Sequence, residues 1–460
     1  MNARYIALKA LLRVEKSGAY SNLVLQGLCN RAAERDEVKP EDNRLAMELL
    51  YGVLRRRMFL DAWIEDLAKR PISKIDPPVL QVLRLALYQL VFLDRIPQHA
   101  ALAESGKLLR LIERKHAVGF VNAVLRNWQR RWRAEKFDPR LPKDALERIS
   151  VSYSIPKFIV DLWRKEAIER GLSEERKILA DLRIRAEAAN KIPPLVLCPN
   201  PVKIESAELT QELKDHQAAP RKGYYAEGSL LLPGSDLAKV ALLMEDGLCH
   251  AMDQSAQLVG LMLEAEPGMR VLDTCSAPGG KSLQIAGLMQ GQGKLIALDL
   301  HESRLELLRY QAKLHGFDSI ETLTADASLD IEGLEHESFD RVLVDAPCSA
   351  LGIIRRHPEI RYRRKAADIA ERARVAKAIL DNAWKYVKPG GSLVFAVCTY
   401  TREEGIEQLQ HFAETHKQAK IVASKAVHDG LWKDTDGLPY MDTSGVPDLD
   451  GFFAFKAVKS

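Results

Sequence analysis

Cysteine is scarce in this chain, and its few copies follow no regular spacing. The 460 residues include six cysteines, at positions 29, 198, 249, 275, 348 and 398. They form neither a C-x-x-C pair nor a disulfide ladder, so we expect reduced thiols. The wide gaps between Cys275, Cys348 and Cys398, with no His pairs nearby, argue against a zinc protein, and we predict no metal site.

Long uncharged apolar runs are also missing. The first helix-like stretch, Ala3 to Val14, is broken by three basic residues, and no later stretch approaches about 18 apolar residues without charge. We therefore expect no signal peptide, no membrane partner and a cytoplasmic location. Hydrophobic residues still make up 47% of the chain, which is ample for large cores and excludes a disordered protein.

The net charge is small, at +4, but it is unevenly spread. Residues 1–140 carry 26 Lys+Arg against 16 Asp+Glu, so the N-terminal part is basic and the rest is mildly acidic. Two tryptophans lie among arginines in the segment Arg126 to Arg133, and rings beside guanidinium groups suit base stacking and phosphate contact with RNA. One interpretation is a polyanion-binding module, and the other is the solvated faces of helices.

Apolar spacing divides the chain into three expected domains. Residues 1–141 predict an all-α domain, whereas 142–247 mix helices and strands as a small α+β linker domain, with helices at 156–170, 173–189 and 206–215 and strands at 194–198 and 229–232. From 248 to 460 strands and helices alternate as in a parallel sheet. The expected strands there are 269–273, 294–299, 319–323, 339–345, 392–397 and 452–457, and the expected helices are 281–289, 303–314 and 366–387.

A glycine turn between a strand and a helix, Val271 to Lys281, predicts a cofactor loop, because glycine lets the backbone approach a ligand closely. Acidic residues end the following strands, at Asp299, Asp326 and Asp345, where carboxylates can accept from ribose hydroxyls and an adenine amino group. The fingerprints G-x-G-x-x-G and G-x-x-x-x-G-K-[ST] are both absent. An adenosyl ligand without a pyrophosphate, S-adenosylmethionine, fits better than NAD or ATP. The alternative is a turn that only packs strand against helix.

Cys348 and Cys398 each follow the end of an apolar run that reads as a strand. A cofactor loop with two strand-end thiols predicts covalent catalysis. The C5 of cytosine or uracil attacks a methyl sulfonium only after a thiolate has added to C6, and a base must then remove the C5 proton so that the thiolate can leave. Two thiols and a carboxylate would cover these roles.

A basic loop, Arg355 to Lys365, follows the Pro-Cys turn. Lying at the mouth of the site, it is expected to contact phosphates and to help hold a base out of its stack. A solvated charged face is the alternative. His357 within it is either an acid/base group or a structural hydrogen-bonding group.

These motifs together resemble RNA cytosine-5 methyltransferases of the Nol1/Nop2/Sun family, through Asp273 to Lys281, Asp345 to Ser349 and the pair Cys398-Thr399. A helical front domain similar to NusB, the segment Gly352 to Ile360 and the closing Asp450 to Phe453 resemble the RsmB (Fmu/Sun) branch. The resemblance implies a multidomain fold with an all-α NusB-like domain, the α+β linker and a Rossmann-like methyltransferase domain dependent on S-adenosyl-L-methionine.

The resemblance also implies roles for residues. Cys398 would be the nucleophile, Cys348 would assist release and Asp345 would contact the target base, although Cys348 is a rival nucleophile because DNA cytosine methyltransferases use the Cys of a Pro-Cys motif. The residues expected to line the cofactor are Cys275, Ser276, Ala277, Pro278, Gly279, Gly280, Lys281, Asp299, Asp326 and Asp345.

The implied substrate is a cytosine of small-subunit rRNA, at family target position 967 of 16S rRNA. We expect the chain to act as a monomer on unassembled rRNA or an early particle. Two other functions stay open: a tRNA cytosine-5 methyltransferase, and an rRNA-binding assembly factor that has lost catalysis. Retention of both thiols, the glycine loop and the three aspartates argues against the second.

Overall fold

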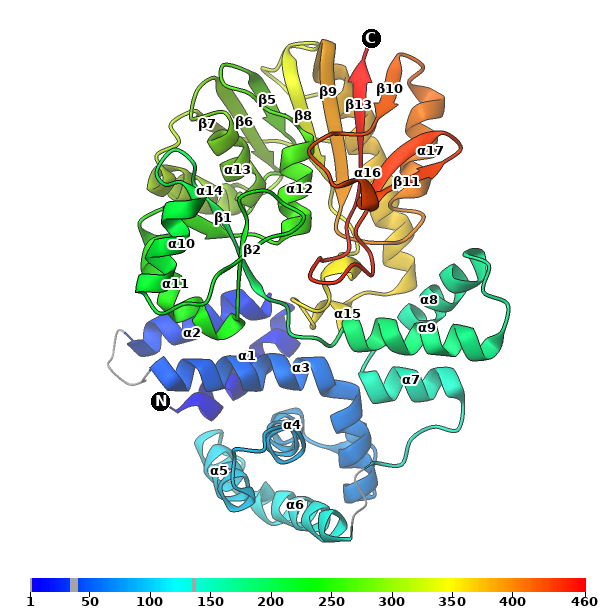
Figure 1. The fold of residues 1–460 in the computed structure, drawn as a ribbon. Coiled ribbons are helices and arrows are strands. Elements are labelled where there is room, and N and C mark those ends of the chain that lie inside the picture. The colour runs from blue at the N-terminus through cyan, green and yellow to red at the C-terminus, as the bar shows by residue number, and fades with distance from the viewer. Residues whose placement is uncertain (1, 34–39, 135–137) are drawn as a thin grey trace. The chain divides into compact units, whose positions relative to one another are not determined.

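The computed structural model describes residues 2–33, 40–134 and 138–460 of the chain. They form two compact units, one of Met1–Lys191 with Ile354–Arg364 and one of Ile192–Ile353 with Lys365–Ser460 (Figure 1). The segment Ile354–Arg364 therefore belongs to the first unit, although in sequence it lies between two parts of the second unit. No described helix is long and apolar enough to cross a membrane.

The first unit is helical, as its apolar spacing predicts. Its helices are α1 (Ala3–Ser17), α2 (Ser21–Ala33), α3 (Pro40–Ala68), α4 (Pro77–Phe92), α5 (Gln98–Leu111), α6 (Val118–Arg133), α7 (Ala145–Tyr153), α8 (Lys157–Glu169), α9 (Glu175–Ala188) and the short α15 (Ile360–Arg363). Asn2 caps α1, since its side-chain oxygen accepts a hydrogen bond from the Tyr5 N–H at 3.0 Å. Trp63 and Trp128 lie fully buried in the shared apolar core of α1 to α6.

The expected linker segment, 142–247, contributes to both units. Its helices α7, α8 and α9 belong to the first unit, and the residues from Ile192 onward belong to the second. There β1 (Leu195–Pro199), β2 (Arg221–Lys222), β3 (Leu230–Leu232) and β4 (Cys249–Ala251) form a small antiparallel sheet in the order β2-β3-β1-β4. With α10 (Ser206–Asp215) and α11 (Leu237–Glu245), this part is α+β, while its standing as a separate domain stays a prediction.

A nine-stranded sheet dominates the second unit. Its order is β11-β12-β13-β9-β8-β5-β6-β7, with β10 paired to β13. The strands are β5 (Arg270–Asp273), β6 (Lys294–Asp299), β7 (Ile320–Thr324), β8 (Phe339–Asp345), β9 (Val387–Val397), β10 (Ala419–Val422), β11 (Trp432–Thr435), β12 (Leu438–Asp442) and β13 (Phe453–Lys459). From β7 to β9 the neighbours run parallel, and β13 runs antiparallel to β9.

Helices cover both faces of this sheet. On one face Val271 of β5 clusters with apolar side chains of α12 (Gln254–Met262), α13 (Gly280–Leu288) and α14 (Glu302–His315). On the other face the adjacent residue Leu272 clusters with α16 (Ala366–Ala383) and α17 (Ile406–Thr415). Successive residues of a strand point to opposite faces, so a strand buried on both sides is apolar at nearly every position.

The chain order reverses at β5. From β5 the chain builds β6 and β7 on one side, and it then returns to add β8 and β9 on the other. Open α/β sheets bind ligands beyond the carboxyl ends of the strands at such a reversal. The fold therefore places the loops after β5, β8 and β9 where the chemistry is expected.

One expected helix is wrong at its end. The helix predicted over 366–387 stops at Ala383, a 3₁₀ turn at Trp384–Tyr386 follows, and β9 already begins at Val387. The Pro-Gly-Gly stop lies inside this strand, next to a register irregularity against β8. Glycines allow the strand to bend there, and the aromatic residues of the 3₁₀ turn are buried in the sheet's core instead of continuing the helix.

The expectation that the loop Arg355 to Lys365 lines the mouth of the site is wrong for its central arginines. Arg361 is fully buried in the first unit, where its Nη atoms donate to the backbone carbonyls of Ser154, Ala189 and Ile354. Arg363 donates to the Ala19 carbonyl at 2.6 Å. Guanidinium donors thus satisfy helix-terminal carbonyls here instead of phosphates. His357 lies in the same segment, with its ring edge-on to Tyr20.

Candidate functional site

Two thiols meet at the carboxyl edge of the large sheet. Cys348 follows β8 after a short turn, Cys398 directly follows β9, and these two strands are parallel neighbours. The sulfur atoms lie 3.3 Å apart, within hydrogen-bonding distance for sulfur. Cys348 is buried and Cys398 is half-buried, and neither forms a disulfide. Two cysteines that lie 50 residues apart in sequence are therefore close enough for their thiols to interact directly.

An ion pair stands beside the thiols. The Lys281 ammonium contacts the Asp345 carboxylate at 2.7 Å and lies over the Phe452 ring, 5.3 Å from its centroid. The hydrogen bond with Cys348 and burial raise the pKa of the Cys398 thiol, the Asp345 carboxylate adds to this shift, and Lys281 opposes it. The contact with Cys348 and burial thus disfavour the thiolate most strongly, and Lys281 favours it.

The loop between β5 and α13 is held tightly against the sheet. The Ser276 N–H donates to the Leu298 carbonyl of β6 at 2.8 Å. Gly279 has φ of +114°, and a Cβ there would lie 2.5 Å from Leu308 Cδ1, so both conformation and space require glycine. The predicted Pro278-Gly279-Gly280 turn thus opens α13 directly below the carboxyl edge of β5.

The three predicted strand-end aspartates differ in their surroundings. Asp299 is buried at the end of β6, and its carboxylate pairs with the Arg304 guanidinium at 3.1 Å. Asp345 ends β8 and holds Lys281. Asp326 follows β7 on an exposed loop, where its carboxylate accepts from the Ser328 N–H and hydroxyl. Since β6 and β8 flank β5, Asp299 and Asp345 border the glycine loop on its two sides.

Two buried polar atoms at this loop have no hydrogen-bond partner in the part of the chain that the structure describes. Among the described residues, the Ser276 Oγ and one carboxylate oxygen of Asp273 have no partner of hydrogen-bonding geometry. Burial raises the pKa of Asp273 to about 7, although the Ser282 hydroxyl donates to its other oxygen at 2.6 Å. Donors and acceptors of this kind fit a zwitterionic adenosyl ligand such as S-adenosylmethionine. In the sequence, Asp273 is the last residue of an apolar strand and the first residue of the glycine-loop motif, and nothing in that pattern indicated a separate role for its carboxyl.

A buried hydrogen-bonded network next to the two thiols was not predicted from the sequence. Ser349, Thr399 and Glu404 are fully buried and linked by hydrogen bonds. The only sequence signal was that two hydroxyl residues follow the two cysteines and that Glu403 and Glu404 come soon after. Short polar residues after a strand are common in loops, so the pattern alone did not indicate a shared site.

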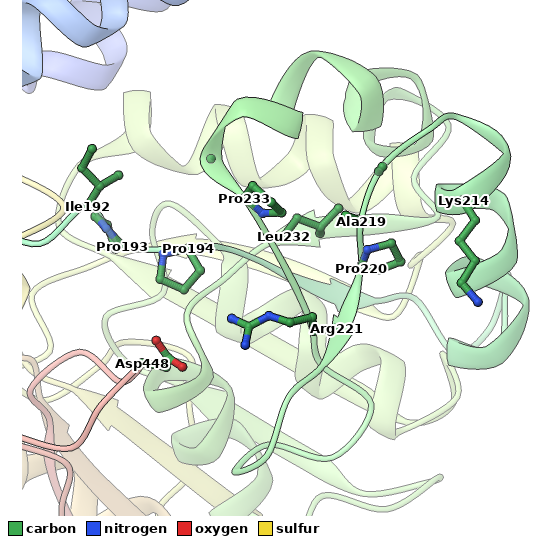
Figure 2. Close-up of a pocket in the computed structure, with 12 residues that line it drawn as sticks. Ile192, Pro193, Pro194, Lys214, Ala219, Pro220, Arg221, Leu232, Pro233 and Asp448 are labelled. Carbon is green, nitrogen blue, oxygen red and sulfur yellow. The ribbon is translucent and has the colours of Figure 1, made fainter. Parts of the chain in front are cut away.

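A separate hollow of about 710 Å³ lies elsewhere in the second unit. Pro193, Pro194, Pro220 and Pro233 line it together with Arg221, which points toward Asp448 in Figure 2. None of the predicted site residues borders it, so its size does not bear on the thiol chemistry. Among the described residues, no group of three or more His, Cys, Asp or Glu side chains could hold a metal ion.

The aromatic and basic segment of α6 has two different tryptophans. Trp128 is buried and stacks on Trp132, with ring centroids 5.1 Å apart, while Trp132 is 40% exposed. Arg131 lies over the Trp63 ring and pairs with Asp66. Trp128 and Arg131 are thus structural, whereas part of the Trp132 ring is exposed.

A glycine loop at the chain reversal and a thiol pair on the next strands place the second unit among the Rossmann-like methyltransferases. The family described as 16S rRNA methyltransferase RsmB/F matches residues 260–456, and the NusB family matches residues 1–130. The chain is 35% identical to the probable ribosomal RNA small subunit methyltransferase B of Bacillus subtilis, over 90% of this chain and 89% of that protein. It is 30% identical to the ribosomal RNA small subunit methyltransferase B of Vibrio vulnificus over the full length of both. The chain belongs to this methyltransferase family.

Solved structures agree on the fold. The crystal structure of PH0851 superposes with a TM-score of 0.81 at 21% identity, covering 100% of this chain and 99% of that one. A methyltransferase homologue from Pyrococcus horikoshii gives a TM-score of 0.51 at 23% identity, covering 65% of this chain and 99% of that one. The NusB-like helical part and the Rossmann-like methyltransferase part expected from the sequence are therefore confirmed.

Proposed function

We propose that this methyltransferase transfers a methyl group from S-adenosyl-L-methionine to C5 of a cytosine in small-subunit rRNA, with position 967 of 16S rRNA as the target. The observation that carries the proposal is the contact of the Cys348 and Cys398 sulfurs, 3.3 Å apart, at the sheet edge that also bears the glycine loop. Packing alone does not require two thiols in contact, and among the described residues no cluster of His, Cys, Asp or Glu could hold a metal ion with them. A pair in contact suits a reaction in which one thiol bonds to the base and the other assists its release.

The cofactor would be held by residues 275–281 together with Asp299, Asp326 and Asp345. Bound there, S-adenosylmethionine supplies an electrophilic methyl group. The loop backbone after β5 and the unpartnered Ser276 hydroxyl would offer polar contacts, and Asp299 would accept from ribose hydroxyls, as carboxylates at the second strand do in related sheets.

Cys398 is assigned as the nucleophile. Its thiolate adds to C6 of the cytosine, and the electron pair that this addition pushes to C5 makes that carbon reactive toward a methyl group. Lys281 lowers the cost of forming the thiolate, as its effect on the pKa of Cys398 indicates. Asp345, beside both Lys281 and the thiols, would contact the exocyclic amino group of the base.

Cys348 is assigned to release. After C5 carries the methyl group, a base removes the remaining C5 proton, and the C6–S bond breaks with its electron pair returning to Cys398. Cys348 is suited to assist this step because it follows the neighbouring strand β8 and its sulfur lies 3.3 Å from the Cys398 sulfur, whose bond to C6 must break. The two cysteines thus act in sequence and not as alternatives.

Substrate RNA would be engaged by the NusB-like residues 1–141 as well as by the catalytic part. Support comes from the basic composition of this region and from the exposed Trp132 on α6. We place the protein in the cytoplasm as a monomer that acts on unassembled rRNA or an early particle. Size-exclusion chromatography with light scattering, with and without a 16S fragment, tests the monomer.

The function is tested by methyl transfer. Purified protein, labelled S-adenosylmethionine and unmodified 16S rRNA should give label in one cytosine, and bisulfite sequencing of rRNA from cells that lack the gene should show that cytosine unprotected. Label in tRNA instead of rRNA would contradict the proposal that small-subunit rRNA is the substrate. Binding of rRNA without any transfer would indicate an assembly factor and contradict the enzymatic role.

A further inference from the structure

A buried carboxylate ties the two thiol-bearing loops together. Glu404 lies between β9 and α17 and is fully buried. One of its oxygens accepts from the Ser349 N–H at 2.6 Å, and the other accepts from the Ser349 hydroxyl at 2.6 Å and the Thr401 hydroxyl at 2.7 Å. A carboxylate held by three donors in the interior has one defined position.

The network continues to both cysteines through the chain. Ser349 directly follows Cys348, Thr399 directly follows Cys398, and their hydroxyl oxygens lie 2.9 Å apart. The Ser349 proton points to Glu404, so the Thr399 hydroxyl donates to Ser349. A relay from Thr399 through Ser349 to Glu404 therefore bridges the residues next to the two thiols.

We propose that Glu404 is a positioning residue that holds the Cys348 and Cys398 thiols in contact by clamping Ser349 and Thr399. Its described hydrogen bonds go to Ser349 and Thr401, so it acts on the thiols through the backbone of the two loops. The inference rests on the roles proposed above for the two cysteines, but the geometry it concerns can be measured without catalysis.

Two substitutions separate hydrogen bonding from charge. Glu404→Gln keeps the length of the side chain: its carbonyl can accept from the Ser349 N–H, and its amide can donate to the two hydroxyls once they rotate. Glu404→Asp keeps the charge but withdraws the carboxylate by one methylene. If Glu404 positions the loops, the Gln variant retains the thiol contact and the Asp variant loses it. Glu403→Asp gives the same shortening one residue earlier, on a half-exposed side chain, and serves as the matched control.

The thiol contact is measured with phenylarsine oxide, which forms two As–S bonds with a close thiol pair and releases its oxygen with the two thiol protons as water. The expected result is tight bidentate binding by the parent protein, by Glu404→Gln and by Glu403→Asp, and binding weakened at least about tenfold in Glu404→Asp, because small misplacements of paired groups cost rate and affinity of that order. Equal binding by Glu404→Asp and the parent would overturn the proposal, as would loss in the Gln variant to the same extent as in Asp.

Turnover gives the second readout. In Glu404→Asp, kcat on rRNA should fall about a hundredfold with KM for S-adenosylmethionine unchanged, since the hydrogen bonds described for Glu404 go to Ser349 and Thr401 and to no residue of the cofactor loop. Equal losses in kcat and cofactor binding would mean general misfolding and would contradict a positioning role. If Glu404→Asp binds the arsenical more weakly but the parent protein transfers no methyl group, the positioning role of Glu404 is supported and the proposed function is refuted. Failure of the positioning role and failure of the proposed function are therefore distinguishable.

Discussion

At the residue scale, Asp273 carries a buried carboxyl whose proton is retained to unusually high pH. Burial raises its pKa to about 7, against an ordinary value of 3.8. Between these values the folded protein holds a proton that the unfolded chain has lost, so the carboxyl contributes less stability as pH rises from about 4 to 7.

Asp273→Asn removes this titration while keeping an acceptor for the Ser282 hydroxyl. The free energy of unfolding of the parent, relative to the Asn variant, should fall by roughly 4 kcal/mol between pH 4 and pH 8, at about 1.4 kcal/mol per pKa unit. Urea unfolding of both proteins without cofactor at several pH values measures it. A difference that stays flat or rises with pH would show that Asp273 ionises normally.

The neutral resting state of Cys398 was not visible in the sequence. Its position after a strand indicated a functional thiol, but the partners that set its pKa come from two other segments, one with Lys281 and one with Asp345 and Cys348. Glu404 was missed for the same reason, because what distinguishes it from Glu403 is burial beside Ser349. Residue types are read from a sequence, whereas the close approach of distant loops is decided by packing.

At the element scale, the turn at Leu351–Ile353 sits where three segments converge. The Gly352 N–H donates to the Cys398 carbonyl at 3.0 Å, and the Gly352 carbonyl accepts from the Gly451 N–H at 2.9 Å. A Cβ on Gly352 would lie 1.9 Å from the Gly451 oxygen, and that atom is backbone and cannot rotate away.

Gly352→Ala should therefore destabilise the protein by about 1–3 kcal/mol and reduce methyl transfer, because the segments must move apart next to Cys398. Gly119→Ala is the control, since this residue of α6 faces open space and alanine favours a helix. Urea unfolding and methyl transfer are the measurements. A Gly352 variant as stable and active as the control would show that the close approach is not required.

The elements themselves were largely predictable. The central strands β5, β6 and β8 fall within a residue of their expected bounds, because strands buried on both faces are continuous apolar runs. The short strands β10, β11 and β12 and the helix α17 were missed. These strands are only four or five residues long and are partly exposed, so they carry little periodic signal. The early end of α16 shows tertiary burial of Trp384 and Tyr386 overriding a proline-glycine stop.

At the scale of the whole molecule, the segment Ile354–Arg364 connects the two units through the chain. It starts just after the Pro-Cys turn yet belongs to the helical unit. Glu359 is buried and accepts from the N–H and hydroxyl of Ser21, both at 2.9 Å. The residues that bury this charged segment lie some 340 positions earlier in the chain, and no local sequence pattern reveals them. For this reason its arginines were predicted to bind phosphates.

Arg361→Lys should lower the free energy of unfolding by at least about 2 kcal/mol, since one ammonium cannot replace the planar fork that serves three carbonyls and the Asn190 side chain. Arg374→Lys, on the exposed face of α16, should change it by less than about 0.5 kcal/mol. Urea unfolding followed by far-ultraviolet circular dichroism compares them. Equal stability of the two variants would contradict the structural role of Arg361.

The division of labour between the two thiols is tested most directly by trapping with 5-fluorocytosine RNA, whose C5 fluorine blocks the release step. The parent protein and Cys348→Ala should form a covalent adduct, Cys398→Ala should form none, and Cys348→Ala should also accumulate an adduct with unmodified rRNA. If Cys398→Ala forms the covalent adduct, or if Cys348→Ala is the variant that fails to form it, the assignment is reversed and Cys348 is the nucleophile.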